Sequence, residues 1–327
     1  TGDRRFGGDL GQFAAFGDAT LKLSKLLSLS AGGRYFRYRR RAGETVLVAN
    51  PITGPDSTLP FAARYRAEGS VGRVRGELRP ATRLLTYVQV SSGFRPGGIN
   101  VVPGLDPTLA VYRDDRLTST EIGARIGLDR DRLQLNAALY RQNWSHMQYS
   151  ALSVVGGYAF ITNVGSARSA GAELGLRWTP SRIVQARIEA TYTDARLASD
   201  QVNATAETAG RKGDSLPYVA RFAVAGSISA DWPIGNRLHL LVDGGINYLS
   251  RSSSTFRAND PDHLTMGDYL LADLSVGIAR DGHRATIFAS NLGNSRGRTW
   301  AASTVFGAGQ LRQVRPRTIG ISLTCTF

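Results

Sequence analysis

The sequence predicts an all-β protein, a transmembrane antiparallel up-and-down β-barrel of about thirteen strands. Apolar and polar residues alternate with a period of two over stretches of about ten residues, longer than the usual globular strand. Very short turns and long loops follow one another regularly. One face of each stretch stays apolar while the other carries charge in mid-strand, which is typical of a barrel with a lipid face and a polar lumen.

The individual strands are predicted from this alternation. The segment "SAGAELGLRW" places Leu174, Leu176 and Trp178 on one face, and Glu173 and Arg177 on the other. Similar segments recur along the chain. They predict strands centred near residues 16, 31, 71, 88, 122, 138, 174, 189, 223, 243, 274, 287 and 321.

The connections predict a meander with all tight turns on one side. Short turns are expected at 23–25, 80–82, 130–131, 180–181, 234–236 and 281–282. Long loops are expected at about 39–63, 96–113, 147–167, 197–215, 251–266 and 295–311. A soluble sandwich would mix loop lengths, and a propeller would repeat four strands per blade.

Aromatic residues are expected at both membrane interfaces. Trp178 and Trp232 immediately precede short turns. Tyr140, Tyr192 and Tyr248 follow a turn by roughly the length of strand that crosses the apolar band. This placement predicts two aromatic girdles.

The composition is basic, with 40 Lys and Arg against 26 Asp and Glu, a net charge of +14. Nearly all of these cations are Arg, which indicates either coding bias or an anion-attracting surface. Because the charge is spread over every segment, no nucleic-acid partner is expected. The densest run, 37–41, is interpreted as a solvated strand end.

The remaining composition limits other chemistry. The single Cys325 excludes internal disulfides, and the four His residues lack ligand spacing, so no metal or cofactor is expected. No apolar stretch is long enough for a membrane helix. The chain begins at Thr1 without Met, so we expect either a removed leader or a longer parent protein.

Several segments closely resemble TonB-dependent outer-membrane receptors. They are "LLTYVQVSSGFRPGGIN", "FITNVGSARSAGAELGLRW", "ATIFASNLGNSRGRTW" and the terminal "RPRTIGISLTCTF". The matched residues include the Ser-x-Gly-Phe-Arg-Pro-Gly segment, Asn163, Gly165, Gly171, Glu173, Asn291, Leu292 and the aromatic end.

The resemblance implies a 22-stranded barrel filled by an N-terminal plug domain. Residues 1–327 would then be the C-terminal part of the barrel domain, with the plug and about nine strands upstream. Phe327 would be recognised by the barrel-insertion machinery. Cys325 stands where many family members have an aromatic residue, which puts that recognition in doubt.

The resemblance also implies a function in the outer membrane of a Gram-negative bacterium. It implies import of a bulky, scarce nutrient, most often a ferric siderophore. TonB and its inner-membrane energising complex would drive this import through the plug. Two alternatives stay open: a passive porin or autotransporter-type barrel, and a soluble basic β protein that binds polyanions.

Candidate ligand contacts lie where strands rise into the long loops. Arg pairs bidentately with carboxylates and phosphates, and aromatic side chains add contact area for a large ligand. The alternative for each residue is packing within the loops, pairing across the lumen or holding the plug. The candidates are Phe94, Arg95, Asn100, Arg113, Trp144, Tyr149, Tyr158, Arg251, Phe256 and Trp300.

Other polar residues are assigned structural roles. Asn163 and Asn291 are expected to bond to backbone, and Glu173 to pair with Arg187. Pro96 should end strand pairing, and the following glycines should let the backbone turn into the loop.

No enzymatic activity is predicted. The segment "GNSRG", at 293–297, matches G-x-S-x-G. A nucleophile elbow needs a helix after the serine and a placed histidine. No helix is expected there, and His283 lies on the preceding strand.

Overall fold

The computed structural model describes residues 3–48, 61–152, 158–201, 209–261, 263–302 and 310–326. Thirteen strands form one antiparallel sheet in which each strand pairs with its neighbours along the chain. Every predicted strand centre falls within one of them. They are β1 (Asp3–Lys22), β2 (Leu27–Val48), β3 (Phe61–Ala81), β4 (Leu84–Arg95), β7 (Asp115–Leu128), β8 (Leu133–Ser145), β11 (Ala167–Trp178), β12 (Val184–Leu197), β13 (Phe222–Gly235), β14 (Leu238–Leu249), β17 (Tyr269–Arg280), β18 (His283–Ser290) and β21 (Thr318–Cys325).

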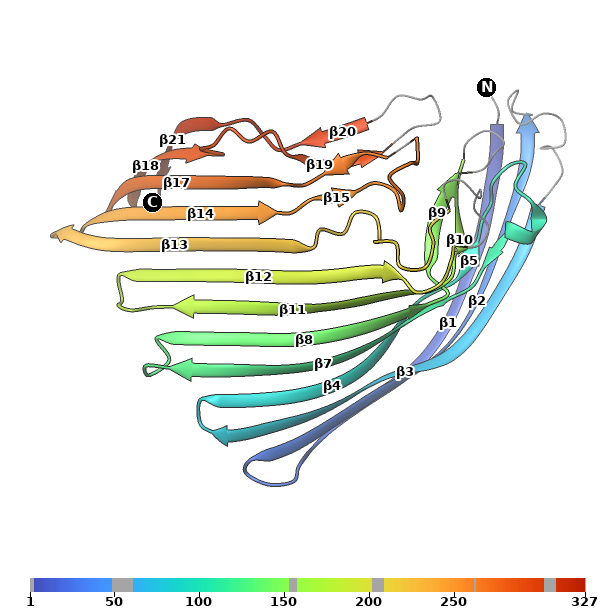
Figure 1. The fold of residues 1–327 in the computed structure, drawn as a ribbon, viewed down its shortest axis with the longest axis horizontal. Helices are drawn as coiled ribbons and strands as arrows, with labels where there is room; N and C mark the ends of the chain where they lie inside the picture. Colours follow the sequence, from blue (N-terminus) through green and yellow to red (C-terminus); the bar gives the residue numbers. More distant parts are fainter. Residues whose placement is uncertain are drawn as a thin grey trace.

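The sheet curves strongly, and its tight turns lie together at one end (Figure 1). The β17–β18 turn shows why two residues suffice. Asp281 and Gly282 both have positive φ, 46° and 84°, and Arg280 pairs directly with His283. Two residues of positive φ form the hairpin turn whose twist matches that of the flanking strands. The short-turn side of the predicted meander is therefore confirmed.

The loop end of the sheet carries small additional elements, drawn at the right and top of Figure 1. The alternation predicts no strands within these loops, yet four of them contain a two-stranded pairing. These elements are β5 (Gly98–Ile99), η2 (Pro107–Leu109), β6 (Val111–Tyr112), β9 (Gln148–Leu152), β10 (Ala159–Asn163), β15 (Ser252–Ser253), β16 (Thr265–Met266), β19 (Arg298–Ala302) and β20 (Gln310–Gln313).

The first long loop is shorter than predicted. It was expected from residue 39, but β2 continues to Val48 and β3 begins at Phe61. Polar residues on both faces of these strands hid their continuation, because the alternation that predicts a strand needs one apolar face. Strands β1, β2 and β3 thus extend well beyond the others (Figure 1).

One face of the sheet is covered with exposed large apolar side chains. Leu174 shows how the register builds it, since it lies between Ala137 of β8 and Ala190 of β12. Leaving such side chains in water forfeits about 1.5–3 kcal/mol each, so the face needs an apolar solvent. Exposed members include Val88, Ile122, Leu139, Leu174, Ile188, Ile228, Ile246, Leu274, Ile287 and Ile321.

The aromatic girdles are confirmed except for one residue. Trp178 and Trp232 are exposed beside short turns, and Tyr192 and Tyr248 are exposed towards the loop end. The assignment of Tyr140 was wrong. It pairs with Glu121 in the sheet, and its hydroxyl bonds to Thr193 at 2.8 Å, so it lies on the polar face.

Buried apolar residues lie mainly beneath the loops rather than inside the sheet. Met147, Val164, Ala167 and Leu197 form one buried cluster at the loop ends of the strands. No helix in the described part of the chain is both long and apolar enough to cross a membrane.

Candidate ligand-binding rim

The loop end of β4 and β7 holds an ion pair between Arg95 and Asp115. These residues are the last of β4 and the first of β7, and the register places them opposite each other. Arg95 donates from Nε to Asp115 Oδ2 at 2.8 Å and from its backbone N–H to Oδ1 at 3.1 Å. The Asp115 side chain is only 3% exposed, whereas that of Arg95 is 51% exposed. The carboxylate therefore fixes a guanidinium that still faces solvent.

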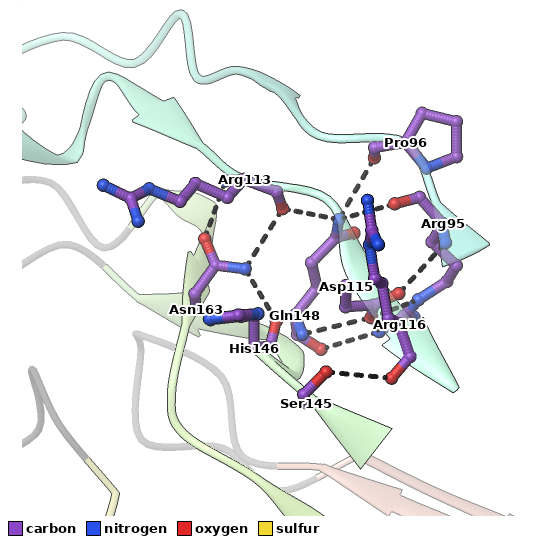
Figure 2. A network of polar contacts seen from close by, with 9 residues as sticks. All are labelled: Arg95, Pro96, Arg113, Asp115, Arg116, Ser145, His146, Gln148 and Asn163. Atoms are coloured by element: carbon purple, nitrogen blue, oxygen red, sulfur yellow. Dashed lines mark hydrogen bonds and ion pairs between the residues drawn. The ribbon is translucent and has the colours of Figure 1, made fainter. Parts of the chain in front are cut away.

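Gln148, the first residue of β9, connects this pair to the next loop (Figure 2). Its backbone N–H donates to Asp115 Oδ2 at 3.3 Å, and its carbonyl accepts from Arg95 at 3.0 Å. Its side-chain amide donates to the carbonyls of Pro96 at 3.1 Å and Arg113 at 2.9 Å. Two loops distant in sequence are thereby joined by one side chain.

Asn163 clamps the backbone of Arg113. Its Oδ1 accepts from the Arg113 N–H at 2.7 Å, and its Nδ2 donates to the carbonyls of Arg113 at 3.1 Å and His146 at 2.7 Å. The expected backbone role of Asn163 is confirmed. The Arg113 guanidinium points away from this network (Figure 2) and is exposed.

Asn291 has the other confirmed backbone role. Its Nδ2 donates to the carbonyls of Ser295 at 2.9 Å and Arg315 at 2.8 Å. Its Oδ1 accepts from the Ser295 N–H at 2.8 Å. It therefore organises the loop that leads from β18 towards β21.

Asn100 is buried between two loops. Its Nδ2 donates to the carbonyls of Leu109 at 2.8 Å and Ile161 at 2.7 Å, and its Oδ1 accepts from the Ile161 N–H at 2.9 Å. These bonds use both amide hydrogens and its oxygen. A buried side-chain amide requires such hydrogen-bond partners.

Gly97 and Gly98, which follow Pro96, let the backbone of this loop lie close to Tyr112. A Cβ on Gly97 would lie 2.5 Å from the carbonyl oxygen of Tyr112, and one on Gly98 would overlap the Tyr112 hydroxyl. Neither residue has positive φ. Close approach to Tyr112, rather than φ, is therefore what requires glycine at these two positions. The Gly97 N–H donates to the Tyr38 hydroxyl at 2.8 Å, which ties the loop to β2.

Aromatic residues reinforce the same region. Phe94 stacks on Phe36 of β2, with ring centroids 3.6 Å apart. The Arg95 guanidinium lies over the Trp144 ring at 4.8 Å. Trp144 also packs against the buried cluster that contains Met147. We call Arg95, Arg113, Asp115, Gln148 and Asn163 the rim network.

Tyr149 and Phe256 connect the rim network to a third loop. Their rings lie 5.5 Å apart, and both pack against the buried cluster. Burial raises the pKa of Tyr149 above its ordinary value. This phenol is therefore neutral at physiological pH and acts as a packing residue with a polar end.

The remaining predicted contacts lie elsewhere on the loop side. Arg251 pairs with Asp268 at 3.1 Å, and the Trp300 ring lies 5.3 Å from the Arg312 guanidinium. The Tyr158 ring lies 5.7 Å from the Arg4 guanidinium. The structure thus gathers Phe94, Arg95, Asn100, Arg113, Trp144 and Tyr149 around one network and does not place Arg251 or Trp300 in it.

The polar face of β4, β7, β8, β11 and β12 forms a hollow of about 670 Å³ nearer the short turns. Tyr87 donates to Glu121 at 2.6 Å on this face, and Arg75 lies over the Tyr87 ring at 4.0 Å. The expected Glu173–Arg187 pair does not form in the described chain. Register places Glu173 opposite Thr191 and Arg187 opposite Arg177.

Sequence reasoning missed Asp115 and Gln148, the residues that hold the rim network together. Asp115 lies within the charged run Arg113-Asp114-Asp115-Arg116, which resembles any charged loop end. No sequence pattern pointed to Gln148. Within the described residues, no group of three or more His, Cys, Asp or Glu side chains could hold a metal ion.

The fold and the face pattern define an outer-membrane β-barrel protein. The family described as "TonB dependent receptor-like, beta-barrel" matches residues 2–292, and the chain belongs to this family. Its members are transport receptors of the Gram-negative outer membrane rather than enzymes. The soluble polyanion-binding alternative is therefore wrong.

Solved structures agree on the fold. The ferric yersiniabactin uptake receptor FyuA from Yersinia pestis superposes with a TM-score of 0.80 at 19% identity, covering 99% of this chain and 47% of that one. The siderophore receptor PiuA from Acinetobacter baumannii superposes with a TM-score of 0.75 at 14% sequence identity. The match covers 98% of this chain and 44% of that one.

The ferric-catecholate import receptor Fiu from E. coli K12, in its closed form, gives a TM-score of 0.74 at 16% identity, covering 98% of this chain and 45% of that one. The chain thus spans about half the length of these receptors. No curated protein matches the sequence.

Proposed function

We propose that the protein takes part in TonB-driven import of a bulky, scarce nutrient, with a ferric siderophore as the substrate class. FyuA, PiuA and Fiu are described as receptors for ferric yersiniabactin, siderophores and ferric catecholates. We further propose that residues 1–327 form the C-terminal part of a 22-stranded barrel whose plug precedes them. The coverage of about half of each receptor supports this division.

The rim network is the observation that carries the substrate proposal. Arg95 and Arg113 present exposed side chains at the loop end, and buried Asp115 and half-buried Asn163 fix their backbones. Asp115 holds the Arg95 guanidinium, which suits an anionic chelate because little conformational entropy is lost on binding, and Arg113 adds a second exposed cation. The predicted contact at Trp144, whose ring lies 4.8 Å from the Arg95 guanidinium, would add aromatic area beside the chelate.

Binding by the full-length protein in detergent tests the proposal. Ferric catecholate, phenolate and hydroxamate chelates are titrated while tryptophan fluorescence is followed. Arg113→Gln should weaken binding of an anionic chelate about tenfold, since a hydrogen bond between charged groups contributes about 1.5–3 kcal/mol. Arg130→Gln, in the β7–β8 turn at the opposite end, is the matched control. If the original protein, Arg113→Gln and Arg130→Gln all bind the chelate with equal affinity, the rim network does not bind the nutrient.

The transport step needs a separate measurement. Uptake of the radiolabelled iron chelate is followed in cells with and without TonB. We expect accumulation to require TonB. Accumulation that continues at the same rate without TonB would instead support the passive-barrel alternative.

A further inference from the structure

Arg37, Arg39 and Arg41 alternate along β2 with two buried aromatic residues. Phe36 and Tyr38 are 0% and 5% exposed and face the loops, whereas the three arginines are exposed. Successive side chains of a strand point to opposite faces. The arginines therefore project from the face that turns away from the loops.

That face is continuous with the apolar exterior of the sheet. Pairing of β2 with β3 runs from Leu27–Leu78 to Glu44–Phe61 without a register shift. Leu27, Leu29 and Tyr35 are exposed on the same side of β2 as the arginines. The order along the strand is thus apolar residues, one aromatic residue, then cations.

We place the Tyr35 ring at the outer hydrocarbon boundary, like the exposed Tyr192 and Tyr248 towards the loop end, and measure the height of the arginines from it. At about 3.3 Å per residue and a tilt of about 40°, Arg37, Arg39 and Arg41 rise roughly 5, 10 and 15 Å beyond Tyr35. The headgroup region of a bilayer extends about 5–8 Å beyond the hydrocarbon on each side. The first two arginines therefore lie in or just above that region.

Two further arginines oppose them across the β2–β3 pair. Arg39 lies directly opposite Arg66, and Arg41 opposite Arg64. Like charges in directly opposed positions destabilise a sheet. In the described part of the chain, none of these five arginines forms an ion pair. The sheet tolerates this repulsion best when an anion from outside neutralises it.

The same face is hollowed beside β1. The lining of a depression of about 500 Å³ includes Arg37, Arg39, Arg41, Arg66, Phe13 and Asp9. Asp9 lies opposite Arg41, and Glu68 opposite Arg37, so two carboxylates face five guanidinium groups. Guanidinium groups bind phosphate bidentately. The Phe13 ring beside them could contact the first carbons of a lipid acyl chain.

We propose that this surface, the β2–β3 arginine patch (Arg37, Arg39, Arg41, Arg64 and Arg66), binds phosphate groups of glycolipid headgroups in the outer leaflet. This proposal rests on the outer-membrane location and is independent of the imported nutrient. It explains why the densest basic run of the sequence stands on the lipid-facing side of β2.

Native mass spectrometry of the full-length protein in detergent tests the proposal, with lipid A bearing two phosphates as the probe. The variant Arg39→Gln/Arg41→Gln/Arg66→Gln should lose about 100-fold in affinity, or about fivefold per arginine near an anionic membrane surface. Dephosphorylated lipid A should bind equally weakly to both proteins. Inorganic phosphate at the same phosphate concentration should not displace lipid A.

The matched control is Arg177→Gln/Arg187→Gln, which removes a directly opposed arginine pair from the polar face of β11 and β12. It should bind lipid A like the original protein. Heat-modifiable migration of each variant shows that its barrel is folded. Unchanged affinity of the triple variant, an equal loss in the control, or displacement by inorganic phosphate would each overturn the proposal.

Discussion

Replacing Asp115 by Asn tests whether the rim network holds the loops in place. The carboxylate accepts from three groups of Arg95 and from the Gln148 N–H. Asparagine keeps the shape but offers one acceptor oxygen, so its NH₂ group would face a donor. With the amide oxygen at the Oδ2 position, three bonds lose their charge assistance and the Arg95 N–H loses its acceptor, for a loss of about 3 kcal/mol. Exposure of Arg95 reduces this figure to about 2 kcal/mol.

Hydrogen exchange measures this loss directly. A loss of about 2 kcal/mol raises the population of the opened loop about 30-fold, and amide exchange of peptides covering 146–152 should accelerate by that factor. Peptides from β13 should not change. Asp129→Asn is the control, because its side chain is 68% exposed in the β7–β8 turn. Acceleration below about threefold in the Asp115 variant, or equal acceleration in the control, would refute the reasoning.

Three more predictions concern the loop side. Gly97→Ala should weaken attachment of the 96–114 loop by about 1–3 kcal/mol through overpacking, measured by hydrogen exchange, whereas Gly93→Ala has free space and should not. Leu197→Ala should cost about 2–5 kcal/mol of loop packing. Limited proteolysis should then cleave the loops faster, and an unchanged cleavage rate would argue against the shared cluster. Because burial raises the pKa of Tyr149, its contribution to loop stability is complete below about pH 10, the usual pKa of tyrosine, and is lost as pH rises through the raised value. Tyrosinate absorbance should show a late-titrating phase whose amplitude falls in Tyr149→Phe, while Tyr218, whose pKa is also raised by burial, continues to contribute to it.

Much of the fold could be predicted from local patterns. The thirteen strands and their short turns follow from alternation and turn chemistry, which involve residues only a few positions apart. The polar-face position of Tyr140 was also readable, since it alternates with Leu139 in β8. The prediction failed there because its distance from the turn was given more weight than its position in the alternation.

The continuation of β2 and β3 was less accessible. Arg37, Arg39 and Arg41 stand on the face whose earlier positions are apolar, so the pattern looked like the end of a strand. The loop after β4 places β5 against these strands, and the Gly97 N–H donates to the Tyr38 hydroxyl. Backbone pairing of β2 continues to Glu44 with β3 and to Val48 with β1. The length of this pairing depends on β1, β2 and β3 together, so the sequence of one strand does not reveal it.

The candidate rim could be predicted only in part. Residue type and position at strand ends pointed to Arg95 and Arg113, and both are exposed at the loop end. Whether any of the ten predicted contacts touches a nutrient stays a prediction. The partners that fix the rim, Asp115 and Gln148, lie 20 and 53 positions from Arg95.

The sequence by itself determined the strand count, the side on which the turns lie, most of the lipid-facing residues and the family. Each of these depends on local periodicity or on short motifs. Only the tertiary structure decided that Gln148 bonds to Pro96, that Asn100 joins two loops and that Arg39 faces Arg66. Such contacts depend on register and loop packing between distant segments, and no pattern within one segment encodes them.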